Sequence, residues 1–214
     1  MSTRPRFIGF IGLDAYDLIL YLGKYLDNLG QKVLIIDYTE NGRLTYLAPT
    51  PITLNPNKDY VRYQNMDFFR GKQEEIQCEE YHYILIDFGW NINQESIKRC
   101  EYVYIITDLQ QQNFDTIYKM QLHETAVYIL LKNYFHDKNI NNMKEYFQEN
   151  HMKFKKCYLF PTTLKDIENM VMLQYYHQIK IHKISRQLKN LIYTILIEHL
   201  DYEEKEVYKI KKLQ

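Results

Sequence analysis

The sequence contains 214 residues, enough for one α/β domain with a sizeable core and no disulfide bonds. Lysine plus arginine and aspartate plus glutamate are equal in number, at 27 each, so the overall charge recruits neither nucleic acid nor an anionic membrane. The three cysteines stand at no metal-binding or paired spacing, which is typical of a reducing compartment. Because no apolar run has the length of a signal peptide or a membrane-spanning helix, we expect a cytoplasmic, soluble protein.

The beginning of the chain predicts a strand, a helix and a second strand. Residues 6–11 form a short apolar run, and residues 14–29 have helical periodicity. Gly30 provides the left-handed exit from the helix, and residues 32–36 form a buried strand that ends at Asp37. Such a tight succession predicts a right-handed parallel unit.

The rest of the chain continues this alternation after an interruption at residues 38–60, which we expect to be loop or edge structure. Four further strands are expected at residues 83–87, 102–107, 127–131 and 157–160, and helices at about 91–99, 111–123, 140–150 and 163–175. Residues 179–209 are continuously helical in pattern, with an expected break near Asp201. The predicted fold is one α/β domain over residues 1–214, a three-layer, doubly wound, mostly parallel sheet (core 6–175) with a long C-terminal helix.

The order of these elements and the residues at their ends resemble the ParA/MinD (SIMIBI) class of P-loop ATPases. Residues 32–45 are similar to the second strand and first switch of that class, and residues 81–90 (YHYILIDFGW) to its acidic strand and second switch. Residues 102–108 and 127–133 fall where the class has its later strands. The class includes the pilus-assembly and localisation proteins TadZ and CpaE, and the resemblance implies a role like that of TadZ.

The phosphate-binding loop of that class, KGGxGKT, falls on residues 10–16, where only Gly12 is retained as a motif glycine. Phe10 replaces the signature lysine, and Ala15 replaces the lysine that clamps phosphate. Tyr16 stands in place of the small hydroxyl residue that holds magnesium. A P-loop depends on its backbone amides, its lysine and its hydroxyl acting together, so we expect this loop to be vestigial.

Two carboxylates strengthen this expectation. Asp14 and Asp17 stand at the start of the first helix, where either can act as its N-cap and satisfy its positive end in place of phosphate. Thr39 also stands where the resemblance predicts a second aspartate of the first switch. ATP hydrolysis by the mechanism of the class is therefore not expected, and we interpret the chain as a degenerate ATPase.

Three polar residues at strand ends form the other candidate site. Asp37 and Asp87 end buried strands on the carboxyl edge of the sheet, where they either hold a metal-bound water or cap the next turn. Asn133 either contacts a purine base, as the resemblance implies, or belongs to a turn. We favour the capping and turn interpretations.

The histidines and cysteines give little support for a metal site or a thiol nucleophile. His177 and His182 are five residues apart and do not share a helical face, so no metal site is expected. Cys100 and Cys157 border strands and are interpreted as small core residues rather than nucleophiles.

Basic residues occur in two short groups. Residues 205–212 form a basic C-terminal end, which is either a solvated helix end or a peripheral contact with the inner membrane. Lys153, Lys155 and Lys156 are interpreted as a solvated strand entrance, so no nucleic-acid partner is expected.

Two functions remain. The first is a non-catalytic scaffold or localisation protein, without a cofactor, that recruits proteins of a membrane-associated machine such as a pilus or secretion system and dimerises through exposed aromatic residues near 81–90. The alternative is an ATPase switch that binds ATP with Mg²⁺, in which Arg43 or Lys72 replaces the missing lysines.

Overall fold

The computed structural model describes residues 4–40, 42, 44, 47, 60–69, 78–91, 94–120, 122, 126–132, 137–160 and 162–210. The strands are β1 (Arg6–Gly12), β2 (Val33–Asp37), β3 (Tyr60–Tyr63), β4 (Met66–Phe69), β5 (Tyr83–Gly89), β6 (Tyr102–Thr107), β7 (Ala126–Lys132) and β8 (Lys156–Phe160). The α-helices are α1 (Tyr16–Asn28), α3 (Gln94–Lys98), α4 (Gln111–Lys119), α5 (Asp137–Glu149), α6 (Leu164–Tyr176), α7 (Arg186–Thr194) and α8 (Glu204–Ile210). Short 3₁₀ turns at η2 (Cys78–Glu80) and η3 (Ile181–Lys183) and a π-helical segment at η4 (Ile195–His199) complete the described elements.

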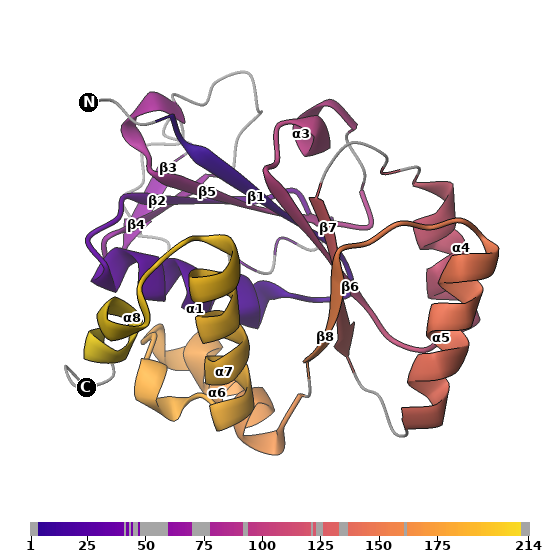
Figure 1. Cartoon of the computed structure of the whole chain (residues 1–214). Coiled ribbons are helices and arrows are strands. Elements are labelled where there is room, and N and C mark those ends of the chain that lie inside the picture. The colour runs from indigo at the N-terminus through magenta and orange to yellow at the C-terminus, as the bar shows by residue number, and fades with distance from the viewer. Residues whose placement is uncertain are drawn as a thin grey trace.

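The strands form one eight-stranded sheet in the order β3-β4-β2-β5-β1-β6-β7-β8. All neighbouring strands are parallel except β3 and β4, which are antiparallel. Helices α1, α6, α7 and α8 cover one face of the sheet, and α3, α4 and α5 lie on the other (Figure 1). The predicted α/β fold, with its mostly parallel sheet in three layers, is confirmed.

The central strands are largely apolar because both of their faces are buried. In β2, Val33 and Ile35 face the cluster that includes α1, whereas Leu34 and Ile36 face the cluster on the opposite side. This alternation places successive side chains in two separate cores. The buried stripe of α1 predicted by its periodicity packs into the first of them.

The hairpin of β3 and β4 was not predicted. The sequence indicated loop or edge structure at residues 38–60 and no strand directly after it. Its strands have four residues each, too few to show a clear period. A two-residue turn at Gln64 and Asn65 joins them, with positive φ at both positions (47° and 66°). The sequence did contain one signal for this turn, since asparagine, here Asn65, is favoured at turn positions that require a positive φ.

The start of α1 differs from the prediction. Ala15 occupies the N-cap and makes no side-chain hydrogen bond there, so neither Asp14 nor Asp17 is the cap. Asp17 lies within the first turn and is buried. The aspartate is directed inward because it has a partner in the protein interior, described below.

The predicted helix over residues 179–209 is divided in the structure. The break near Asp201 is confirmed, with a left-handed φ of 62° at that residue. The guanidinium of Arg6 donates to the carbonyls of His199 and Leu200, each at 3.2 Å, and so satisfies the end of the preceding helix. After the break, α8 folds back with Val207 and Ile210 buried.

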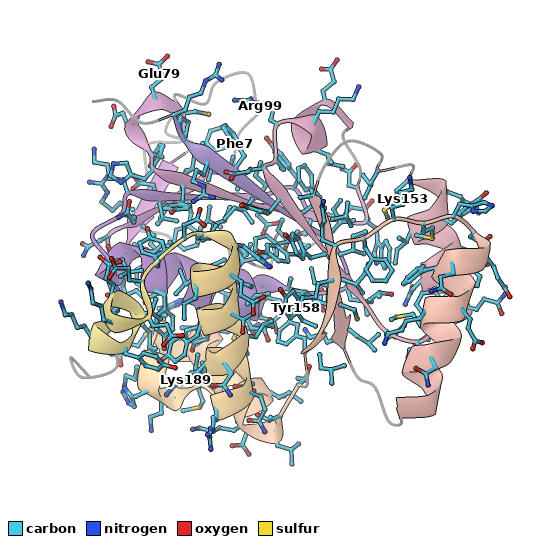
Figure 2. All side chains as sticks on the ribbon, viewed as in Figure 1. Phe7, Glu79, Arg99, Lys153, Tyr158 and Lys189 are labelled. Atoms are coloured by element: carbon cyan, nitrogen blue, oxygen red, sulfur yellow. The ribbon has the colours of Figure 1, made fainter. Side chains whose placement is uncertain are left out.

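Beside this break, His199 is enclosed by tyrosines. Its Nδ1 lies 2.5 Å from the hydroxyl of Tyr104, and its Nε2 lies 2.8 Å from that of Tyr158. Tyr158 lies between β8 and α7 in Figure 2, and its hydroxyl also donates to Glu198 at 2.8 Å. Burial lowers the pKa of His199 below its usual value, so the ring is held neutral.

Lowering the pH is expected to destabilise the protein through His199. The unfolded ring takes up a proton as the pH falls through 6.5, whereas the folded ring resists, so stability is lost below that pH. The loss is at most about 1.4 kcal/mol per pH unit. Urea unfolding between about pH 7.5 and 5.5 measures the slope, which should be shallower in His199→Phe. A variant with the wild-type slope would show that another group is responsible.

Candidate functional site

An open depression of about 790 Å³ lies at the carboxyl edge of the sheet. It is lined by residues that follow six of the strands: Gly12, Leu13, Asp14, Thr39, Glu40, Phe88, Gly89, Trp90, Asn91, Asp108, Lys132, Thr162 and Ile167. The carboxyl edge is where parallel α/β sheets place their ligand sites. The depression is therefore the candidate functional site.

The loop between β1 and α1 is held tightly against β6. Gly12 has a φ of +106°, and a Cβ atom at this position would clash with the carbonyl oxygen of Ile106. The amide of Leu13 donates to that same oxygen at 2.9 Å. Only three residues separate the end of β1 from the start of α1. The loop therefore follows the neighbouring strand instead of arching over a ligand.

The residues expected in place of the P-loop lysines lie in the core. Phe10 is fully buried and stacks on Tyr104, with ring centroids 5.4 Å apart. Ala15 is buried and Tyr16 half-buried, and both pack in the cluster beneath α1. Of loop residues 10–16, Gly12, Leu13 and Asp14 line the depression, and Asp14 is exposed.

Lys132, at the end of β7, is a residue of the candidate site that the sequence analysis did not predict. Its Nζ donates to the carbonyl oxygen of Asp14 at 2.5 Å and lies 3.9 Å from Oδ1 of Asp17. The ammonium also lies 4.7 Å from the ring centroid of Phe160. The side chain is buried, although it lines the depression. A lysine at the end of an otherwise apolar strand was the signal in the sequence.

Asp17 is the carboxylate that balances Lys132. Burial raises the pKa of Asp17, and Lys132 and the Leu18 amide, which donates at 2.9 Å, oppose this rise. Asp166 on α6 adds to the rise and is itself held by the Ser185 amide at 2.7 Å. The charge of Lys132 is therefore already shared with a buried carboxylate and a backbone carbonyl.

The two strand-end acids lie together, as expected, because Asp37 and Asp87 are register partners in β2 and β5. Asp37 accepts hydrogen bonds from the Thr39 amide (3.0 Å), the Thr39 hydroxyl (2.5 Å) and the Leu44 amide (2.9 Å). Asp87 accepts one from the Gly89 amide at 3.0 Å. Both carboxylates thus have the hydrogen bonds expected of turn caps.

The mouth of the depression combines an indole with carboxylates. Trp90 is partly exposed and covers Gly12, since its Cη2 lies 3.5 Å from where a Cβ of that glycine would stand. Asp14, Glu40 and Asp108 contribute carboxylates, and Lys132 is the only basic side chain among the described lining residues. The local charge therefore opposes a polyphosphate.

The predicted aromatic dimer surface at residues 81–90 is largely absent. Tyr81, Tyr83 and Phe88 are buried, and only Trp90 among the aromatic residues of this segment is exposed. The reason is that β5 is a central strand with both faces covered.

The other predicted candidates do not form a reactive site. Burial raises the pKa of Cys100 to about 12 and that of Cys157 to about 11, which keeps both thiols protonated. His177 contacts the carbonyl of Leu47, while His182 is exposed on η3. Within the described ranges, no group of three His, Cys, Asp or Glu residues could hold a metal ion.

Several predicted residues lie outside the described ones, namely Asn133, Arg43, Lys72 and residues 211 and 212. In α8, the apolar side chains Val207 and Ile210 face the core rather than an outer surface. Among the helices that the structure describes, none is long and apolar enough to span a membrane.

Comparison with solved structures identifies the fold. Apo McdA from Cyanthece superposes with a TM-score of 0.60 at 13% identity, covering 97% of this chain and 98% of that one. A chain of the MinC:MinD cell division protein complex from Aquifex aeolicus gives 0.55 at 13% identity, covering 78% and 86%. The fold is that of the ParA/MinD-type P-loop ATPases.

A similar fold occurs in a synthase. Cobyrinic acid a,c-diamide synthase from Mycobacterium smegmatis matches with a TM-score of 0.53 at 13% identity, over 81% of this chain and 92% of that one. No protein-family model matches the sequence, and no curated protein matches it significantly. At these identities the likeness concerns the fold alone, so function must be argued from the site.

Proposed function

We propose that this protein is a non-catalytic scaffold or localisation protein that has kept the ParA/MinD-type fold without its phosphate-binding chemistry. The contact of Lys132 with the β1–α1 loop carries the proposal. The ammonium is bound to the carbonyl of Asp14 and balanced by the carboxylate of Asp17, so its charge is not free to neutralise a phosphate at this loop.

Charge at the mouth of the depression supports the same conclusion. Two unit charges about 4 Å apart interact by about 4 kcal/mol at the dielectric of a protein surface. Asp14, Glu40 and Asp108 would repel a triphosphate, and Trp90 covers the glycine that would have to approach it. A partly exposed indole beside carboxylates instead suits contact with a protein partner.

The partner belongs to a membrane-associated assembly in this proposal. One of the similar structures is a chain of the MinC:MinD cell division protein complex, so a protein of this fold is found in a complex with another protein. The sequence resemblance to TadZ and CpaE favours a pilus or secretion system, with the protein a homodimer in the cytoplasm at the inner membrane.

The alternative is a nucleotide switch with an atypical loop, and the position of Lys132 is the observation that favours it. Its Nζ lies beside the N-terminal end of α1, where phosphate binds in P-loop proteins. To bind phosphate there, Lys132 would have to leave Asp17 and so expose a buried carboxylate to an anion. This requirement makes the switch the weaker candidate.

Thermal unfolding with and without millimolar MgATP tests the choice. A scaffold should show no change in melting temperature. A nucleotide switch at 100 times its Kd would gain about 2.7 kcal/mol, which raises the melting temperature of a chain of this size by roughly 5 to 10 °C. A shift of that size would contradict the proposal.

Asp14→Asn provides a matched control for this test. It removes an exposed carboxylate but leaves Lys132 on the backbone carbonyl of residue 14, so it should bind MgATP no better than the wild type. Ala15→Lys is unsuitable as a restoring variant because residue 15 is buried in the core.

A further inference from the structure

Helix α6 carries apolar side chains on its outer as well as its inner side. Met170 and Leu173 are buried against the core, together with the polar Asp166. The outer side presents six large apolar residues, each between 48% and 79% exposed: Leu164, Ile167, Val171, Met172, Tyr175 and Tyr176. A surface helix of a monomer is normally polar on its outer side, so this face is unusual.

The exposed residues form a continuous surface. Leu164, Ile167, Val171 and Tyr175 follow one another at spacings of three and four and therefore share a stripe along the helix. The helix lies with α1, α7 and α8 on one side of the sheet (Figure 1). The six side chains together expose roughly 800 Å², above the size of the apolar patches common on monomers.

A partner that covered most of this area would bury close to the roughly 800 Å² per chain that is typical of a stable protein–protein interface. Two exposed charged residues lie on the same face. Glu168 is three or four residues from Leu164, Val171 and Met172 and therefore lies among them, and the ammonium of Lys165 is turned back to the carbonyl of Ile184 at 3.3 Å. The whole chain has no net charge, so two copies do not repel one another.

We infer that the outer face of α6 is a homodimer interface, and that its occupant is α6 of a second copy of this chain. A two-fold axis near the middle of the helix brings Leu164 of one copy against Tyr175 of the other, and Ile167 against Val171 or Met172. The apolar stripe is thus complementary to itself, which is the requirement for an isologous dimer.

This inference deepens the proposed function by naming the surface through which the scaffold dimerises. Ile167 belongs to the stripe and also lines the depression. The second copy would therefore lie beside the mouth of the depression, and dimerisation and partner recruitment would share one side of the molecule. Neither the stripe nor its test depends on whether the depression binds nucleotide.

Light scattering of the full chain after size exclusion tests the interface. The wild type should elute at twice the 26.2 kDa of one chain over loading concentrations of about 1 to 100 µM. Val171→Asp buries a charge in the interface and should weaken association at least 100-fold, giving a monomer. The matched control is Tyr118→Asp, equally exposed but on α4 across the sheet, and it should remain dimeric.

A charge-pair experiment separates loss of the interface from loss of the fold. Val171→Asp should be monomeric with a wild-type melting curve, whereas Val171→Lys, which this register places opposite the Glu168 carboxylate of the second copy, should remain dimeric. A monomeric wild type, or a Val171→Asp variant that stays dimeric, overturns the inference. If MgATP raises the melting temperature while the α6 variants behave as stated, the scaffold proposal fails and the interface stands.

Discussion

Replacing Lys132 with methionine is expected to destabilise the protein by about 3 to 5 kcal/mol, the usual consequence of removing one partner of a buried ion pair. Methionine has a similar length, so the change removes the charge and the hydrogen bond to Asp14 more than it removes volume. Asp17 would then be a buried carboxylate without its cation. Urea unfolding at neutral pH measures the loss.

The pH dependence of this loss identifies Asp17 as the cause. Burial raises the pKa of Asp17, so the folded protein holds a proton more tightly than the unfolded chain, and the contribution of this group is greatest at low pH. Without Lys132 the pKa rises further, so Lys132→Met should cost less at about pH 5 than at about pH 8.

Two variants serve as comparisons for Lys132→Met. Combining it with Asp17→Asn should recover most of the lost stability, because neither position of the pair then carries a charge. Lys156→Met removes another lysine, paired with Glu198 at 2.7 Å but exposed, and should cost less than about 1 kcal/mol. If Lys132→Met were as mild as Lys156→Met, the loop would not depend on the buried pair.

Replacing Gly12 with alanine is expected to cost about 3 kcal/mol or more. The φ of +106° at this position is unfavourable for any residue with a Cβ, which accounts for about 1 to 3 kcal/mol. The added Cβ also clashes with the carbonyl oxygen of Ile106, which is backbone in the centre of the sheet and cannot move aside cheaply. Denaturant unfolding of Gly12→Ala measures the sum.

Gly30→Ala separates the two contributions. Gly30 also has a left-handed φ, +79°, but a Cβ there meets no atom within 4 Å. Its replacement should therefore cost only the backbone strain, about 1 to 2 kcal/mol. Equal losses for the two variants would show that the contact between Gly12 and β6 is not important for stability.

Much of the fold was predictable because its signals are local. The apolar runs from residue 32 and from residue 83 mark buried parallel strands, and Gly30 marks the end of α1. The short hairpin of β3 and β4 was missed, since its strands have four residues each and show too little periodicity. The break at Asp201 was visible in the pattern, but the contact with Arg6 that supports it was not.

The candidate site was only partly predictable, because sequence signals are local whereas the site is assembled from distant parts of the chain. The residues at positions 10, 14, 15 and 16, which differ from the P-loop pattern, can be read directly from the chain. Where their side chains lie cannot be predicted in this way, because a strand residue such as Phe10 faces the core or the sheet edge according to the elements that pack on the strand. The aromatic surface expected at residues 81–90 was wrong because β5 lies in the middle of the sheet.

Local patterns in the chain account for the α/β class and for the parallel strand–helix–strand unit at its start, and they predict a loop without the P-loop side chains. The packing of the whole chain sets which residues meet at that loop. Lys132 reaches the loop from 118 residues away because β6 alone separates β7 from β1 in the sheet. Periodicity and turn chemistry act over a few residues, whereas the order of strands is set by the packing of the whole chain, and it is that order which brings Lys132 to Asp17.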